Sequence, residues 1–140
     1  MNFVLDSSLT FAFLFADEAT DNTDKLLYAL GQGGSAFVPA LWHWEVGNGL
    51  FQAERRKRIT PADTNRHLTA LRSLPVETDE NATGEAWNST LLLARKHGLT
   101  IYDAAYLEVA IRHGLPLGSL DAELRKAAKT EGVKVLPDKC

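Results

Sequence analysis

Short apolar segments alternate with longer segments of helical periodicity along the whole chain. The apolar segments predict strands at residues 3–5, 36–38, 75–77, 115–118 and 133–136. Strands that are separated by helices favour a parallel sheet with helices on both of its faces. We therefore predict an α/β fold with three layers, α/β/α, around a central and mainly parallel sheet.

The segments between these strands predict helices, because apolar residues recur in them every three or four positions. Trp42, Val46 and Leu50 show this spacing in one segment. Trp87 and Leu91 show it in another, so we expect both to face the core. Capping residues, prolines and glycines set the approximate bounds of these helices, which are 8–16, 22–30, 42–58, 60–74, 81–97, 103–113 and 121–130.

Length and composition favour one domain that covers residues 1–140. A chain of 140 residues can bury one core, and no repeat or linker divides it. Its only cysteine, Cys140, excludes an internal disulfide and a multi-cysteine metal site. No targeting signal is recognisable, and the longest apolar run, 11–16, is far shorter than the ~20 residues that cross a bilayer. We expect a cytoplasmic protein without membrane association.

Four acidic residues are predicted to lie at one rim of the sheet. Asp6 follows the first strand, Glu45 begins the helix after the second strand, Asp103 begins a later helix, and Asp121 follows the fourth strand. Ligands of open parallel sheets bind at the carboxyl ends of the strands. Converging carboxylates repel one another unless a cation compensates them, and Mg²⁺ prefers oxygen ligands and phosphate. The pattern predicts a metal site for phosphodiester hydrolysis by activated water.

Each acid also fits a structural role. Asp6 and Asp121 each precede a helix, where aspartate is a favourable N-cap. Asp103 lies three residues after Thr100, which is the spacing of a capping box, and the same signature occurs at residues 60–63. The ordered set of four is more specific than any one of its members.

At these positions the sequence resembles the PIN-domain ribonucleases, and particularly the VapC toxins of bacterial toxin–antitoxin pairs. The resemblance implies a PIN-like fold in which Asp6, Glu45, Asp103 and Asp121 bind Mg²⁺ or Mn²⁺. It also implies an endoribonuclease toxin that leaves 5′-phosphate and 3′-hydroxyl ends, forms a homodimer and is neutralised by a cognate VapB-type antitoxin. It covers essentially the whole chain through the segments VLDSS (4–8), VPALWHWEVGNGL (38–50), LTIYDAAYL (99–107) and LPLGSLD (115–121).

The same resemblance suggests supporting residues. Ser8 corresponds to the small polar residue that supports the first aspartate, and Ser119 stands where the family more often has threonine. Asn48 lies three residues after Glu45, where it would orient the carboxylate, contact RNA or form a hydrogen bond between helices. Glu123 is a weaker candidate for the further acid that some members have.

Charge and hydrophobicity bear on the partners. A net charge of −3, from 15 basic and 18 acidic residues, first argues against nucleic acid. Without the four proposed ligands, 14 acidic residues remain, so the metal site accounts for much of this charge. The basic run 55–58 is either an RNA contact or a solvated helix end, and we expect most basic residues in 125–129 to be solvated. The apolar helix 8–16 is either buried or covered by a partner, and the resemblance favours the partner.

Two other functions are compatible with these residues. A non-catalytic module of the PIN fold would keep the groove for RNA or protein but bind little metal. A phosphatase would use Asp6 as a covalent nucleophile. Such enzymes generally have a second acid two residues later, where this chain has Ser8.

Overall fold

The computed structural model describes all residues from Met1 to Cys140. Strands and helices alternate along the chain as the hydrophobic pattern predicts. Their order is β1 (Asn2–Leu5), α1 (Ser7–Leu14), α2 (Asp21–Gly31), β2 (Ser35–Pro39), α3 (Leu41–Arg55), α4 (Pro61–Arg72), β3 (Val76–Asp79), α5 (Ala82–Glu85), α6 (Ser89–His97), α7 (Ile101–His113), β4 (Leu117–Gly118), α8 (Ala122–Thr130) and β5 (Val135–Leu136).

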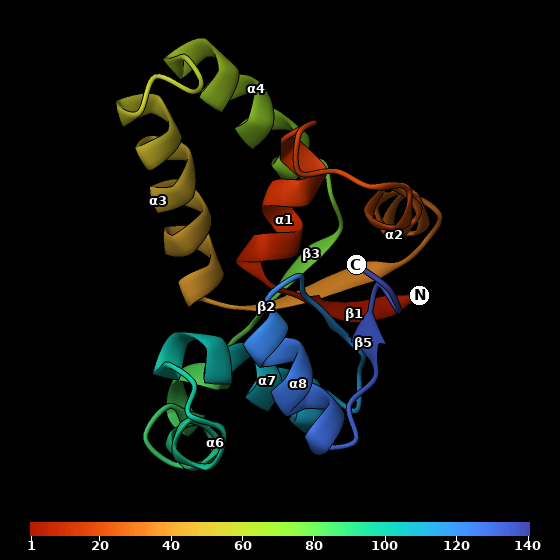
Figure 1. Cartoon of the computed structure of the whole chain (residues 1–140), viewed down its shortest axis with the longest axis vertical. Coiled ribbons are helices and arrows are strands. Elements are labelled where there is room, and N and C mark those ends of the chain that lie inside the picture. Colours follow the sequence, from red (N-terminus) through yellow and green to blue (C-terminus); the bar gives the residue numbers. More distant parts are fainter.

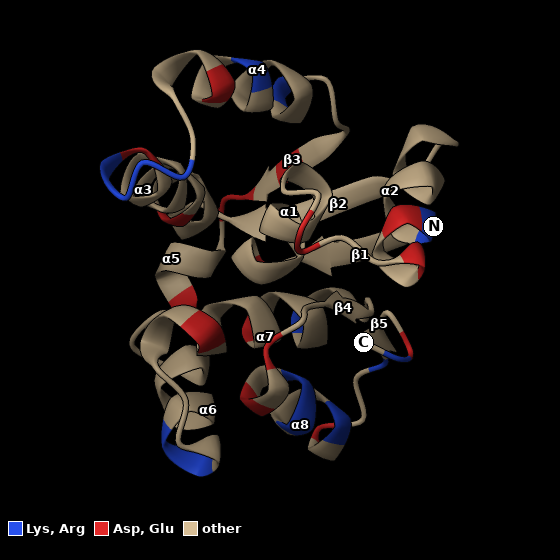
Figure 2. Ribbon diagram, turned by 45° about the horizontal axis from the view of Figure 1, so that its top comes forward, with Lys and Arg blue, Asp and Glu red and all other residues tan.

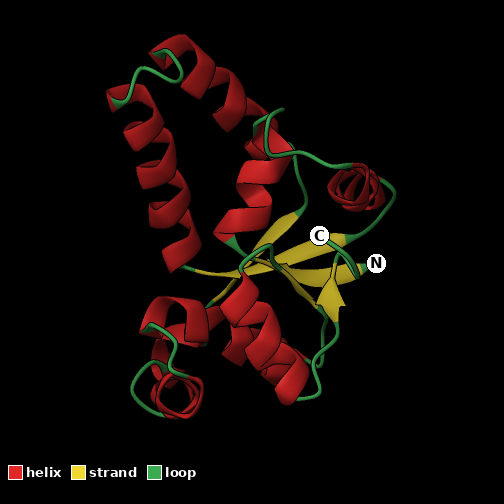
Figure 3. Ribbon diagram, viewed as in Figure 1, coloured by secondary structure: helices red, strands yellow, loops and turns green.

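The sheet has the strand order β3-β2-β1-β4-β5, and every pair of neighbours is parallel. Helices α1 to α4 lie on one side of it, and α7 and α8 lie on the other with α6 (Figures 1 and 3). The predicted three-layer α/β/α fold is therefore confirmed. The chain runs outward from β1 to β3 and then returns to the other side of β1. This places a topological switch point, the usual ligand site of such sheets, between β1 and β4.

The core is densest around β1 and α7. Phe3, Val4 and Leu5 are fully buried, as is typical of a strand that is covered on both faces. Every residue from 104 to 110 of α7 is buried as well, because this helix packs against the sheet and also against α6 and α8. Trp42 is buried on the other side, where its indole Nε1 donates to Thr10 Oγ1 at 2.9 Å. No helix is both long and apolar enough to cross a membrane.

The single helix predicted over residues 81–97 is wrong. The chain forms α5 and α6 instead, and Trp87, which lies between them, is 89% exposed. Gly84 and Asn88 are poor helix formers, and Asn88 adopts a non-helical conformation just before α6. The Asn88 amide bonds to the Glu85 carbonyl at 3.0 Å, which closes a tight turn. The period of four between Trp87 and Leu91 therefore does not mark a continuous buried face.

The basic run at residues 55–58 lies at the end of α3 and in the turn that follows it. Lys57 has a φ of 58°, so the chain leaves the helix before residue 58. Arg58 donates to Asp17 and Glu18, each at 2.8 Å, and its guanidinium lies 4.1 Å from the centre of the Phe15 ring. Arg58 therefore links this turn to the segment after α1. This role is neither the RNA contact nor the solvated helix end that we expected for the basic run.

Helix α1 is largely covered by the chain itself. Phe15 is buried, and the Phe11 ring stacks on it with the centroids 5.9 Å apart. A Cβ atom at Gly49 would lie 2.1 Å from Cζ of Phe11, so this glycine makes room for the ring. Phe13 and Leu14 are only partly buried, and a partner that covers them stays a prediction.

Two glycines should respond to substitution in opposite directions. A Cβ at Gly118 would lie 2.7 Å from Leu9 Cδ2 and 3.0 Å from Phe3 Cδ2, in the core. We expect Gly118→Ala to lower the free energy of unfolding by about 1–3 kcal/mol through overpacking. Gly47 lies on the exposed side of α3 with no atom within 4 Å of its Cβ position, so Gly47→Ala should raise that free energy by about 0.5–1 kcal/mol. Urea unfolding checks both, and equal signs would contradict the packing described here.

Candidate functional site

Asp6 lies at the switch point between β1 and β4. The β1–β4 ladder ends with the Asp6 amide, which donates to the Gly118 carbonyl at 3.1 Å. The Asp6 carboxylate then accepts from the Leu9 amide at 2.9 Å, so Asp6 is the N-cap of α1. It also accepts from the hydroxyls of Ser8 at 2.7 Å and Ser119 at 2.5 Å. The supporting contacts expected of Ser8 and Ser119 are therefore present in the structure.

Burial raises the pKa of Asp6 to about 6, even though the Leu9 amide and the two serine hydroxyls favour the charged form. The negative charge of Asp103 adds to the increase. Asp6 is only 3% exposed. Keeping the Asp6 carboxylate charged in this buried position therefore lowers the stability of the fold.

Glu45 lies in the first two turns of α3 and reaches toward α7. Its Oε1 accepts a hydrogen bond from the hydroxyl of Tyr106 at 2.5 Å. Half-burial raises the pKa of Glu45, the Tyr106 hydroxyl opposes this, and the charge of Asp103 adds to it. Burial and the nearby Glu45 raise the pKa of Tyr106, so the phenol stays protonated as the donor. No sequence signal distinguishes Tyr106, because an apolar helix face accommodates tyrosine equally well.

Asp103 is the acid whose charge acts on the others. Partial burial raises its pKa, as does the charge of Asp121. The Asp103 amide donates to Thr100 Oγ1 at 3.1 Å, so Thr100 caps α7. The reciprocal bond from a capping box is absent here, whereas Asp63 makes it with the Thr60 amide at 2.8 Å. The Asp103 carboxylate is therefore not used by the cap.

Asp121 is the N-cap of α8, where it accepts from the Leu124 amide at 2.8 Å. Its own amide donates to Ser119 Oγ at 3.0 Å, so one serine hydroxyl joins Asp6 to Asp121. Arg125 belongs to the basic group 125–129, of which we expected most residues to be solvated, but it is buried and donates to the Ser119 carbonyl at 2.9 Å. This arginine supports the backbone of the site from α8.

The remaining candidates lie outside this network. Asn48 is exposed on α3 and makes no side-chain hydrogen bond, so neither a bond to Glu45 nor the alternative bond between helices is present. Glu123 is exposed in the first turn of α8. Roles for either residue toward RNA or metal stay predictions.

The donor chemistry of the four acids fits a hard divalent cation, since all of them offer carboxylate oxygens and Asp103 interacts electrostatically with the other three. None of the four forms an ion pair with a lysine, arginine or histidine. Figure 2 shows acidic positions on α3, α7 and α8, with basic positions at the ends of α3 and α6 and along α8. No three His, Cys, Asp or Glu side chains are close enough to hold one ion, so the carboxylates would have to move together to bind it.

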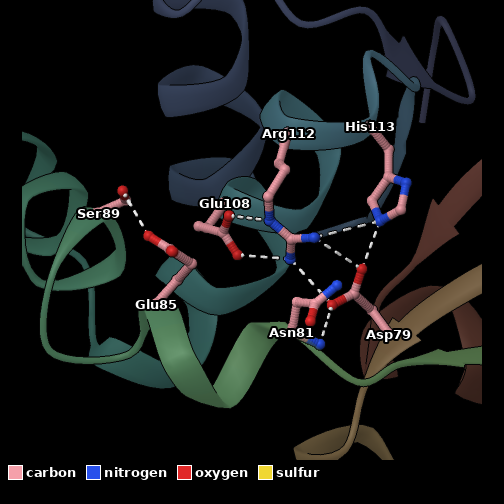
Figure 4. A network of polar contacts seen from close by, with 7 residues as sticks. All are labelled: Asp79, Asn81, Glu85, Ser89, Glu108, Arg112 and His113. Carbon is pink, nitrogen blue, oxygen red and sulfur yellow. Dashed lines mark hydrogen bonds and ion pairs between the residues drawn. The ribbon is translucent and has the colours of Figure 1, made fainter.

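A second polar cluster lies at the end of β3, and the sequence did not reveal it (Figure 4). Buried Asp79 accepts two hydrogen bonds from the Arg112 guanidinium, at 2.9 and 3.0 Å, and another from His113. Arg112 also donates to buried Glu108 at 2.7 Å. Burial alone would raise the pKa of Asp79, but Arg112 and His113 hold it well below its usual range. This cluster fastens α7 to the sheet.

The sequence is similar to those of known proteins. The sequence matches the PIN domain over residues 3–130. The chain belongs to the PIN-domain family. One relative, "Ribonuclease VapC3" from Pyrobaculum aerophilum, is 28% identical over 124 residues, which cover 89% of this chain and 92% of that protein. Another from the same organism, "Exonuclease VapC9", is 39% identical over 90 residues, which cover 64% of this chain and 62% of that protein.

Solved structures share this fold. The crystal structure of PAE2754 from Pyrobaculum aerophilum has a TM-score of 0.67 and 31% sequence identity, and the match covers 97% of this chain and 92% of that one. VapBC2 from Rickettsia felis, bound to a DNA fragment from its promoter, has a TM-score of 0.67 at 15% identity, over 96% of this chain and 97% of that one. The predicted resemblance to the VapC-type PIN domains is confirmed.

The raised pKa of Asp6 predicts that Asp6→Asn will not destabilise the metal-free protein at neutral pH. Above pH 6 the native carboxylate is charged and buried, which costs up to about 3 kcal/mol relative to an unfolded pKa of about 3.9. As the pH falls from 6 to 4, the folded wild type takes up the proton first and regains this stability. The advantage of asparagine should therefore be largest above pH 6 and vanish below pH 4.

Urea unfolding in EDTA between pH 4 and 7.5 measures this difference. Asp138→Asn is the control, because Asp138 is exposed and its side chain makes no hydrogen bond. An Asp6→Asn variant that is less stable than wild type at every pH would show that capping and the serine bonds outweigh the burial of charge.

Arg112→Met should destabilise the protein, because it leaves Asp79 and Glu108 buried without their cation. Loss of one partner of a fully buried pair costs about 3–5 kcal/mol. The Arg112 side chain is 28% exposed, so we expect a smaller loss of about 2–3 kcal/mol. Arg95→Met on α6 is the matched control, since Arg95 is exposed and unpaired, and it should change the free energy of unfolding by less than about 0.5 kcal/mol. Equal effects of the two substitutions would contradict the role of the cluster.

Proposed function

We propose that this protein is a metal-dependent endoribonuclease toxin that hydrolyses RNA phosphodiester bonds and is neutralised by a cognate VapB-type antitoxin. One observation carries the proposal: Asp6, Glu45, Asp103 and Asp121 lie at one rim of the sheet, and none has a basic partner within the chain. A divalent cation, Mg²⁺ or Mn²⁺, would compensate their charge. The relative named a ribonuclease supports RNA as the substrate.

In this proposal the four acids hold the cation and the surrounding residues hold the acids. Ser8 and Ser119 orient the Asp6 carboxylate, and Ser119 also fixes the backbone of Asp121. The ion would supply a more acidic and more nucleophilic water and would offset the negative charge of the phosphate. Without it, the carboxylates repel RNA, so we expect RNA binding to depend on the metal.

Basic residues near the end of α3 are candidates to bind RNA phosphates. Arg55, Arg56 and Lys57 are exposed and form no ion pair, whereas Arg58 is paired within the chain. Phosphate contacts of this kind add affinity without sequence selectivity, and they weaken as salt increases.

The antitoxin is part of the proposal because similar folds occur in structures described as toxin–antitoxin complexes, such as one from Klebsiella pneumoniae with a TM-score of 0.57 and 16% identity. The partly buried residues Phe13 and Leu14 on α1 offer apolar surface for such a partner or for a second copy in a homodimer. Both assemblies are proposals.

Cleavage of a circular RNA tests the activity and the mode of attack together. An endonuclease opens a circle, whereas an exonuclease such as the one named among the relatives needs an end. We expect the purified protein, free of antitoxin, to cut linear and circular RNA in Mg²⁺. Asp103→Asn and EDTA should each reduce the rate at least about 100-fold, because the metal site is lost.

Asp63→Asn is the matched control, since Asp63 has the same Thr-x-x-Asp spacing but bonds to the Thr60 amide. It should weaken the capping box of α4 slightly and leave the cleavage rate unchanged. Cleavage that survives EDTA or Asp103→Asn would refute the mechanism. Cleavage of linear RNA alone would refute the endonuclease. RNA binding without cleavage and without stabilisation by Mg²⁺ would instead indicate the non-catalytic module, and a trapped phospho-aspartate the phosphatase.

A further inference from the structure

Tyr106 connects the two sides of the candidate site. It lies on α7, one turn after Asp103, and its side chain is 1% exposed. Its hydroxyl donates to Oε1 of Glu45 on α3 at 2.5 Å, which is the only side-chain hydrogen bond between these two helices. Helices α3 and α7 lie on opposite sides of the sheet (Figure 1), so this bond crosses the rim where the four acids lie.

The buried ring and the hydroxyl have separable roles. The ring fills the core beside the buried residues Leu107 and Val109 of the same helix, and phenylalanine would fill the same space. The hydroxyl contributes little to that packing. A phenol is a hydrogen-bond donor at neutral pH, and its acceptor here is one of the four acids rather than a backbone carbonyl.

The position of the bond suggests what it does. Glu45 lies on α3, on the opposite side of the sheet from α7. Its carboxylate is joined to α3 only by the flexible glutamate side chain. Repulsion from Asp103 would otherwise turn the Glu45 carboxylate outward to solvent, since it is only half-buried. The hydroxyl of Tyr106 counteracts this repulsion and keeps the carboxylate at the rim.

We infer that Tyr106 is a positioning residue of the metal site, whose hydroxyl keeps the Glu45 carboxylate at the rim, where it is available to bind the divalent cation. The inference rests on the proposed function, in which Glu45 is a metal ligand. Substitution of a residue that forms a hydrogen bond to a metal ligand typically lowers metal affinity or activity by about 10- to 100-fold. If the hydrogen bond served only to join α3 to α7, its removal would change the melting temperature and leave metal affinity unaltered.

Binding of Mn²⁺ alone to the full chain, in the absence of RNA, tests this inference. Titration calorimetry well below the melting temperature gives the dissociation constant, and thermal melts with and without Mn²⁺ give a second reading. We expect Tyr106→Phe to weaken Mn²⁺ binding by about 10-fold or more. Tyr102→Phe is the matched control: it is the same substitution one turn earlier on α7, at a residue that is 62% exposed and forms no hydrogen bond, and it should bind Mn²⁺ as the wild type does.

A double-mutant cycle with Glu45→Gln gives an answer even if Tyr106→Phe lowers the melting temperature. If the hydroxyl acts through Glu45, Tyr106→Phe should cause less than a twofold further change in Mn²⁺ affinity once Glu45 is replaced. Equal affinity of Tyr106→Phe and wild type for Mn²⁺ would overturn the inference while leaving the proposed function intact. So would an unchanged effect of Tyr106→Phe in the Glu45→Gln background. A wild type that binds no Mn²⁺ would overturn the inference and the metal-dependent function together.

Discussion

The hydrogen bonds of the buried Asp6 carboxylate determine how the candidate site is built. Asp6 ends the central strand β1, caps α1 and accepts from Ser119, which follows the neighbouring strand β4. The Ser119 hydroxyl in turn accepts from the Asp121 amide, and Asp121 caps α8. Three secondary-structure elements therefore meet at one carboxylate, and the shared serine places Asp121 beside it. The same group is also the least favourably buried charge of the site, since its pKa is raised by burial.

Much of the fold was predictable because it depends on local patterns. The alternation of strands and helices gave the layers, and the rule that sites lie at the carboxyl ends of parallel strands gave Asp6 and Asp121. The break between α5 and α6 was missed because apolar spacing favoured one helix, while Asn88 adopts a non-helical conformation that turns the chain and leaves Trp87 exposed. Local periodicity indicates a face, but it does not show that the helix is continuous.

The contacts that organise the site were less accessible to sequence reasoning. Tyr106 and Glu45 are 61 positions apart, and Arg112 and Asp79 are 33 apart. Such pairs depend on how whole helices are placed, which no single segment specifies. Arg125 is a further example. An arginine on a helix is typically solvated, yet this one is buried and donates to the Ser119 carbonyl. The acids and the two supporting serines could be named from the sequence, whereas the contacts of Tyr106 and Arg125 required the structure.

The Asp79 cluster and the four-acid candidate site show how the fold separates a structural role from a functional one. Asp79 is as deeply buried as many core residues, but Arg112 and His113 satisfy its charge and lower its pKa. Asp6 is buried to a similar degree and receives only neutral donors, so its pKa rises instead. Both clusters contain carboxylates of the same intrinsic acidity, and the difference lies in whether the chain supplies the cation. A chain that pairs the two buried acids Asp79 and Glu108 with an arginine, and leaves four other acids without any cation, keeps a site whose charge a cation from solution would balance.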